Sequence, residues 1–184
     1  MSVEYNRNMD WERIISSSLE RNEGSLIRYA CGITGDLESA KDVVQETFLK
    51  LSQQDLPSIE DHVDAWLFRV CRNCALDYKR KIIKMPTMPN DHFAHEPSPE
   101  PDPSRNASTR EESKIIMSLV SRLPERQREL IALKFSSDLS YKEMSDITGS
   151  SVSHVGVQLH DAIARLRILW KESTQTPTLK KSHG

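Results

Sequence analysis

Cationic, amide and aromatic side chains gather between residues 65 and 81, and they are the groups best suited to chemistry with another molecule. Arginine presents planar donors to phosphates and stacks on bases, and aromatic rings offer further stacking surfaces. Asn73 adds both a donor and an acceptor for a base edge. This composition predicts contact with nucleic acid, including unpaired strand. The alternative is a solvated cationic face with Trp66 and Tyr78 packed in the core.

A second segment, residues 140–170, has the pattern of two helices joined by a tight turn. Ser140 and Glu143 have capping-box spacing, and Gly149 supplies the turn before a long apolar stripe. In a helix-turn-helix, the first turns of the second helix enter the major groove. The residues at those positions are Ser151, Ser153, His154, Val157 and Gln158.

That second helix carries no lysine or arginine from residue 152 to residue 163. Phosphate contacts dominate affinity for DNA, so we expect this module to bind DNA weakly when it acts alone. A helical hairpin without any ligand is the alternative interpretation of the same segment.

Charge is divided between neighbouring segments of the chain. The net charge is only −2, which does not by itself indicate a nucleic-acid-binding protein. Residues 36–64 hold eight acids against two lysines, whereas residues 69–84 hold six bases against one acid. Adjacent acidic and basic surfaces predict two different partners. For the acidic helix at 36–50, the alternative to a docking face is an ordinary solvated helix side.

Catalysis, metal binding and membrane insertion have little support. The sequence has no phosphate-cradling glycine loop, zinc-ligand spacing or nucleophile motif, so we expect neither an enzyme nor a cofactor. Cys71 and Cys74 lie in an apolar helical stripe, which predicts packing in a core instead of metal binding. No apolar run reaches the roughly 20 residues of a membrane span. Three cysteines without a signal-peptide pattern indicate the cytoplasm.

Apolar periodicity predicts an all-α protein with two small helical domains. The first, residues 10–84, contains helices at 10–34 with a break near residues 22–24, at 37–51 after an N-cap at Asp36, and at 61–83. The predicted buried face of that last helix consists of Ala65, Trp66, Val70, Cys74 and Tyr78.

The second half of the chain is separated from the first by a proline-rich stretch. Residues 85–108 contain six of the nine prolines and are expected to form an extended linker. The second domain, residues 109–172, is predicted to begin with a capping box at Thr109 and Glu112. The tail at 173–184 has no core pattern.

Both modules resemble the bacterial sigma-70 family, specifically its small extracytoplasmic-function (ECF) members. The residues that carry the resemblance are DLESAKDVVQETFLKL at 36–51, AWLFRVCRNCALDYKR at 65–80, LPERQREL at 123–130 and SYKE at 140–143. The first block is similar to the family's core-polymerase-binding helix and the second to its −10 promoter helix. The last two resemble its −35 module.

The resemblance implies a protein that binds core RNA polymerase, directs it to promoters and helps open the DNA. Core-polymerase contacts would come from Asp36, Asp42, Gln45, Glu46 and Leu49. Contacts with the −10 element would come from Trp66, Arg69, Arg72, Asn73, Lys79 and Arg80. Contacts with the −35 element would come from Lys142, Ser151, Ser153, His154, Gln158 and Arg165. The loop at 53–60 would, by similarity, receive a flipped −10 base.

Many relatives are held inactive by an anti-sigma factor, so this is a further partner that the resemblance implies. Two other functions stay open. One is a helix-turn-helix regulator that binds duplex DNA without polymerase. The other is an interaction module that an anti-sigma partner holds and that has lost its contact with DNA.

Overall fold

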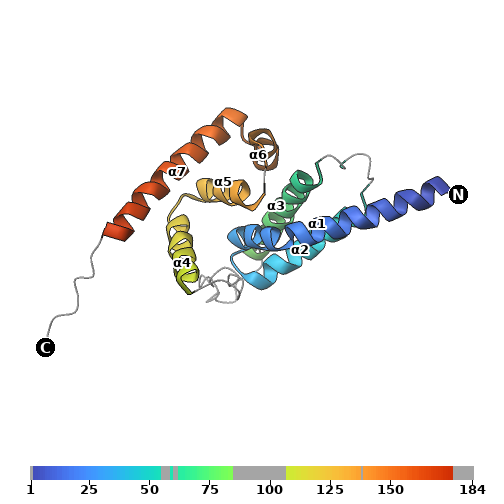
Figure 1. Cartoon of the computed structure of the whole chain (residues 1–184), viewed down its shortest axis with the longest axis horizontal. Helices are drawn as coiled ribbons and strands as arrows, with labels where there is room; N and C mark the ends of the chain where they lie inside the picture. The colour runs from blue at the N-terminus through green and yellow to red at the C-terminus, as the bar shows by residue number, and fades with distance from the viewer. Residues whose placement is uncertain (1, 55–58, 60–61, 85–106, 138, 176–184) are drawn as a thin grey trace.

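The computed structural model describes residues 2–54, 59, 62–84, 107–137 and 139–175, and within them every regular element is a helix. The helices are α1 (Ser2–Thr34), α2 (Leu37–Ser52), α3 (Val63–Lys84), α4 (Ala107–Ser121), α5 (Glu125–Ser136), α6 (Tyr141–Thr148) and α7 (Val152–Gln175). Figure 1 shows α1–α3 gathered in one unit and α4–α7 in a second. The all-α prediction is therefore confirmed for this part of the chain.

Most of the predicted linker, residues 85–108, lies outside the described residues, and its last two residues begin α4. The predicted tail is helical to residue 175, and the remainder lies outside the described residues. Among the helices that the structure describes, none combines the length and apolar character needed to cross a bilayer.

The first unit is held together by side chains from all three of its helices. Leu26 and Tyr29 of α1, Leu51 of α2 and Phe68 of α3 are each at most 2 % exposed. The rings of Tyr29 and Phe68 meet edge to face with centroids 5.5 Å apart, a geometry that aromatic pairs favour. Because each helix buries a stripe against the other two, α2 and α3 are fixed next to one another.

Helix α2 begins as predicted. The Asp36 side chain accepts a hydrogen bond from the backbone N–H of Ser39 at 2.8 Å, which satisfies one of the donors left over at a helix start. Gly35 turns the chain between α1 and α2 with φ of 96°, in the region that favours glycine. Ala40 and Val44 of α2 are buried in the core of this unit.

The predicted break in the first helix is wrong, because α1 runs without interruption from Ser2 to Thr34. Asn22, in the segment where the break was expected, is buried and uses its amide to bind two partners. Its Nδ2 donates to the Ser18 carbonyl at 3.1 Å and to Asp64 Oδ1 at 2.9 Å. Packing against α3 therefore stabilises polar residues that local propensity alone would place in a turn.

The face of α3 that enters the core also differs from the prediction. The buried residues are Val63, Leu67, Phe68, Cys71, Cys74 and Ala75. Of the predicted face only Cys74 is fully buried, while Ala65, Trp66, Val70 and Tyr78 pack at the edge of the core. Two adjacent apolar stripes run along this helix, and α3 must contact both α1 and α2, so the stripe between those neighbours is the one that becomes buried.

The second unit is a compact arrangement of α5, α6 and α7, with α4 packed along α7. Leu133 of α5, Met144 of α6, and Val155 and Leu159 of α7 are each at most 1 % exposed. These four side chains fix the angle between the last two helices. The residues at the start of α7 consequently project from the unit.

The helix-turn-helix caps are formed by the residues that predicted them. Ser140 accepts a bond from the Glu143 backbone N–H at 3.2 Å, and the Ser140 backbone N–H donates to Glu143 Oε2 at 2.7 Å. Gly149 ends α6 in the left-handed conformation with φ of 69°. The other predicted cap, at Thr109, is wrong, because α4 already begins at Ala107.

Replacing Ser140 with alanine should lower the free energy of unfolding by about 1 kcal/mol at neutral pH. This corresponds to a fall in melting temperature of about 4–8 °C for a small domain. Hydrogen bonds from Ser140 hold the pKa of Glu143 below its usual range, so this stabilisation is present above the ordinary glutamate pKa and is lost as pH falls through the lowered one.

Thermal unfolding of wild type and Ser140→Ala at pH 7 and pH 3 measures both effects, and we expect the difference to shrink on acidification. Ser153→Ala, an exposed serine in the first turn of α7, is the matched control and should leave stability unchanged. A Ser140→Ala variant as stable as this control would contradict the capping role.

Candidate nucleic-acid interface

The outer face of α2 gathers the acidic residues that were predicted to dock on a protein. Asp42, Gln45 and Glu46 are exposed, and Leu49 is 63 % exposed among them. Asp36 is half-buried at the start of the same helix because it caps it. An exposed leucine surrounded by carboxylates is a composition suited to a protein interface with a basic partner.

Glu46 is fixed within this face by an ion pair along the helix. Lys50 Nζ lies 2.8 Å from Glu46 Oε1, and the hydrogen bond from Lys50 lowers the pKa of Glu46. Lys50 Nζ also lies 3.1 Å from Cys74 Sγ on α3. This contact lies at the boundary between the acidic face of α2 and helix α3.

The two cysteines of α3 are core residues, as predicted. Cys71 is 0 % exposed and Cys74 is 4 % exposed. Burial raises the pKa of Cys71 to about 12 and also raises the pKa of Cys74, so both thiols stay protonated at neutral pH. In the described residues, no group of three or more His, Cys, Asp or Glu side chains is arranged to hold a metal ion.

Helix geometry divides the predicted −10 residues of α3 into two sets. At about 100° per residue, one set falls on a single side of the helix and consists of Trp66, Arg69, Asn73 and Arg80. Arg69, Asn73 and Arg80 are exposed, and Trp66 packs its ring partly against the core. In the described contacts, Arg80 pairs with Asp77 on its own helix, at 2.6 Å. We call this the open side of α3, because three of its four side chains are exposed within the described residues.

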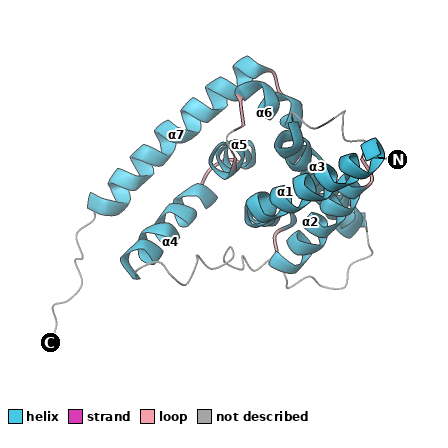
Figure 2. Ribbon diagram, turned by 45° about the vertical axis from the view of Figure 1, so that its right-hand side comes forward, coloured by secondary structure: helices cyan, strands magenta, loops and turns pink. Residues whose placement is uncertain are grey.

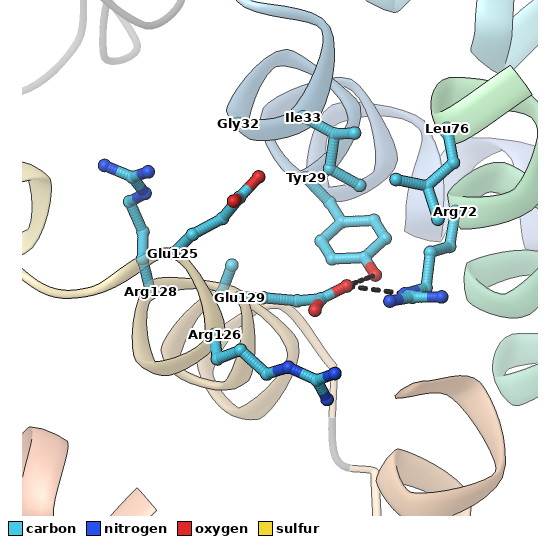
Figure 3. A pocket seen from close by; sticks show the side chains of 10 residues that line it. Tyr29, Gly32, Ile33, Arg72, Leu76, Glu125, Arg126, Arg128 and Glu129 are labelled. Carbon is cyan, nitrogen blue, oxygen red and sulfur yellow. Dashed lines mark hydrogen bonds and ion pairs between the residues drawn. The ribbon is translucent and has the colours of Figure 1, made fainter. Parts of the chain in front are cut away.

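The second set, Arg72 and Lys79, is turned toward α5 and is already paired. Arg72 Nε donates to Glu129 Oε1 at 2.6 Å, and Lys79 Nζ lies 3.2 Å from Glu125 Oε1. Tyr29 Oη donates to the same Glu129 oxygen at 3.0 Å, as Figure 3 shows. Burial, together with the nearby Glu129 charge, raises the pKa of Tyr29 well above its usual value, so the phenol remains a donor.

A cavity of about 220 Å³ lies beside these contacts, between the two units. It is lined by Tyr29, Gly32, Ile33, Arg72, Leu76, Glu125, Arg126, Arg128, Glu129 and Ala132. Figure 3 shows Tyr29, Arg72 and Glu129 meeting at one edge of it. Sequence reasoning missed the roles of Tyr29, Glu125 and Glu129, since nothing local indicates that α5 faces α3.

At the start of α7, four predicted −35 residues share one side of the helix. They are Ser151, His154, Gln158 and Arg165, whereas Ser153 falls on another side at about 100° per residue. Ser151 also accepts a bond from the His154 backbone N–H at 3.2 Å and so stabilises the helix start. Gln158 is half-buried and Lys142 is exposed on α6.

Cations near this side come mainly from α5 and α6. Arg126 Nη1 donates to Ser150 Oγ at 3.0 Å, immediately before α7, and Lys134 Nζ lies 5.9 Å from the centre of the Tyr141 ring. Sequence reasoning did not single out Arg126. The sequence signal available for Arg126 was its position two residues after Pro124, at the start of α5. Helix α5 packs against α7.

Comparison with known families agrees with this arrangement of two helical units. The model of sigma-70 region 2 matches residues 19–82, and the model of sigma-70 region 4 matches residues 113–166. The ECF RNA polymerase sigma factor SigM of Bacillus subtilis is 30 % identical over 144 residues, which cover 78 % of this chain and 86 % of SigM. The ECF RNA polymerase sigma factor RpoE of Cereibacter sphaeroides is 33 % identical over 130 residues, covering 71 % and 69 %.

The chain belongs to the ECF group of the sigma-70 family. Sigma factors bind core RNA polymerase and direct it to promoters, so this protein is a promoter-directed transcription initiation factor. In this ECF sigma factor, region 2 comprises the second half of α1 with α2 and α3, and region 4 comprises most of α4 together with α5, α6 and the first part of α7.

Two solved structures share the fold of this sigma factor. The sigma factor RpoE from Bartonella quintana, solved with the anti-sigma factor NepR, superposes with a TM-score of 0.62 at 22 % identity, covering 85 % of this chain and 96 % of that one. CnrH, solved with the cytosolic domain of CnrY, superposes with a TM-score of 0.57 at 24 % identity, covering 88 % and 90 %. These likenesses support the two-unit helical fold.

Proposed function

We propose that the outer faces of α2 and α3 in region 2 have separate functions in this sigma factor. The α2 residues Asp36, Asp42, Gln45, Glu46 and Leu49 dock on core polymerase. The α3 residues Trp66, Arg69, Arg72, Asn73, Lys79 and Arg80 hold the −10 element. The observation that carries the proposal is that α2 and α3 share one core while presenting opposite charge to solvent. A single rigid body can therefore place promoter DNA at a fixed position relative to polymerase.

Strand opening follows from the chemistry of the α3 face. Unstacking a base costs a few kcal/mol, and stacking on an aromatic ring returns about 1–3 kcal/mol per base. Arg69 and Asn73 add phosphate and base-edge contacts on the open side of α3. Because stacking on an aromatic ring requires an unstacked base, it favours the melted state over the duplex. The residues at 53–54 and 59, which belong to the loop expected to receive a flipped base, lie just ahead of this helix.

Region 4 holds the −35 duplex in this proposal, with a modest contribution to affinity. Lys142, Ser151, Ser153, His154, Gln158 and Arg165 are its candidate contacts. The first turns of α7 lack cations, so phosphate neutralisation depends on flanking side chains such as Arg126 and Lys142. Polymerase-bound region 4 would be positioned on the duplex by the enzyme, which offsets the weak intrinsic affinity.

The protein acts in the cytoplasm, where polymerase and the chromosome are found, and it needs no cofactor or catalysis of its own. An anti-sigma factor is a further partner class, since a solved relative of the same fold, RpoE from Bartonella quintana, was co-crystallised with the anti-sigma factor NepR. The division of the chain into residues 10–84, 85–108, 109–172 and 173–184 is part of the same proposal.

Reconstituted transcription tests the proposed function. Purified protein and core polymerase are incubated with genomic fragments, and transcripts with defined 5′ ends are expected only when both proteins are present. A helix-turn-helix regulator would instead bind duplex fragments without polymerase and yield no transcript. The absence of any promoter-dependent product across the genome would contradict the proposal.

A further inference from the structure

The side of α7 that points directly away from its core is not the side on which most of the predicted −35 residues lie. Val155 and Leu159 are each at most 1 % exposed and mark the buried side of the helix. At about 100° per residue, the residues opposite them are Ser153, Val157 and His160, and all three are exposed. The outward side of these first turns therefore carries a hydroxyl group, an apolar side chain and an imidazole.

Gln158, a predicted −35 contact, is partly withdrawn from that outward side. It is half-buried, and Gln127 Nε2 of α5 donates a hydrogen bond to its Oε1 at 3.5 Å. The Gln158 amide thus already serves the contact between α5 and α7. Sequence recognition by hydrogen bonds is consequently limited in the first turns of α7, and apolar contacts with base edges gain importance there.

Gly156 lies inside α7, where glycine is less favourable than any residue except proline. Its backbone does not require glycine, because among the described glycines only Gly35 and Gly149 have a positive φ. A Cβ atom added at residue 156 would lie 3.6 and 3.8 Å from its nearest neighbours, two ring carbons of Tyr141. Since that is ordinary van der Waals contact, the fold tolerates alanine here, and the missing side chain points to a use outside the fold.

The missing side chain leaves a notch on the surface of α7, which we define by Val152, Gly156, Val157 and the ring of Tyr141. Val152 lies one turn before Gly156 and Val157 follows it, and these valines are 46 % and 57 % exposed. Tyr141 forms the third wall from the start of α6, which Figure 2 shows beside the first turns of α7. The walls of the notch are therefore apolar, and Val157 places it at the edge of the outward side.

Cationic side chains lie around the notch. Lys134 Nζ is 5.9 Å from the centre of the Tyr141 ring, and the next residue, Lys142, is exposed. Arg126 Nη1 donates to Ser150 Oγ just ahead of α7. Contacts of flanking cations with phosphates position a protein on duplex DNA, whereas contacts inside the groove carry the sequence information. This arrangement suits an apolar group on a base edge that enters between the phosphate contacts.

We propose that the notch at Gly156 receives the 5-methyl group of a thymine in the −35 element, which makes Gly156 and Val157 specificity-determining residues. Thymine alone among the four bases presents a methyl group in the major groove, and apolar side chains contact it there. Removing one methyl group from water should raise affinity roughly fourfold. This inference rests on the proposed function, which places the start of α7 on the −35 duplex.

The test compares thymine with deoxyuridine, which lacks only the 5-methyl group, at each thymine of a −35 element. Full-chain protein and core polymerase transcribe a thymine template and a deoxyuridine template in one reaction, and the two transcripts differ in length. We expect the wild type to favour the thymine template about fourfold at one position, and Gly156→Ala and Val157→Ser to abolish this preference. The same base exchange between the −35 and −10 elements is the DNA control and should have no effect.

Gly156→Ala also separates a filled notch from a damaged fold, because alanine should raise the melting temperature through its higher helix propensity. Gly24→Ala is the matched control, since Gly24 is an exposed glycine inside α1 and its replacement should leave the thymine preference unchanged. A preference that survives in either notch variant would overturn the inference. Equal transcription of both templates by the wild type would overturn the inference alone, whereas no transcript from either template would overturn the proposed function with it.

Discussion

Replacing both Arg69 and Asn73 with alanine is expected to reduce formation of the open promoter complex by about 30-fold or more, because two contacts are lost and each contact with a phosphate or base contributes about 1–3 kcal/mol. Both side chains are exposed on the open side of α3 and are remote from the buried core of region 2. The loss should therefore appear in strand opening, while binding to core polymerase stays within about twofold.

Permanganate footprinting of the promoter, combined with a competition assay for core polymerase, separates the two effects. Arg28→Ala is the matched control, since Arg28 is exposed on α1 and bonds only within its own helix in the described contacts. A bubble of normal intensity with the double variant would remove the −10 role from α3. Arg72→Ala should give a mixed result, because it deletes a proposed phosphate contact and also breaks the ion pair with Glu129.

Reversing charge at Asp42 and Glu46 is expected to weaken binding to core polymerase by at least about 10-fold, since placing like charges against one another costs up to several kcal/mol at an interface. Asp42→Arg with Glu46→Arg changes the outer face of α2 and leaves its buried stripe intact. Far-ultraviolet circular dichroism should accordingly match that of the wild type.

The binding assay is a pull-down at several salt concentrations, with Glu23→Arg on α1 as the control for added positive charge. The Lys50 hydrogen bond holds the pKa of Glu46 below its usual range, so the Glu46 carboxylate stays ionised between pH 8 and pH 6. Wild-type binding to core polymerase should therefore not weaken over this range through loss of the Glu46 charge. Equal recovery of wild type and double variant would show that α2 is not the docking face.

Features set by a few neighbouring residues were predictable from the sequence. The Asp36 cap and the Ser140 capping box were correct because each depends on side chains no more than three residues apart. The exposed acidic face of α2 was likewise predicted by periodicity and charge. The presence of the helices and the contrast between an acidic α2 and a basic α3 therefore follow from the local sequence pattern.

Features decided by contacts between distant residues were not predictable. Helix α1 continues through Asn22 because Asp64, 42 residues away, accepts a hydrogen bond from the Asn22 amide. The buried side of α3 is selected by the positions of α1 and α2 and not by hydrophobicity alone. Glu129 meets Arg72 across 57 residues and Tyr29 across 100, and no local signal encodes either pairing.

Photo-crosslinking from two positions of region 2 tests most directly whether α2 binds polymerase and α3 binds the −10 strand. A benzophenone side chain placed at residue 49 or at residue 73 is activated in reconstituted promoter complexes. The account predicts crosslinks from residue 49 to polymerase and from residue 73 to the melted −10 strand. Crosslinks from residue 73 to polymerase alone, with promoter DNA unlabelled, would contradict it.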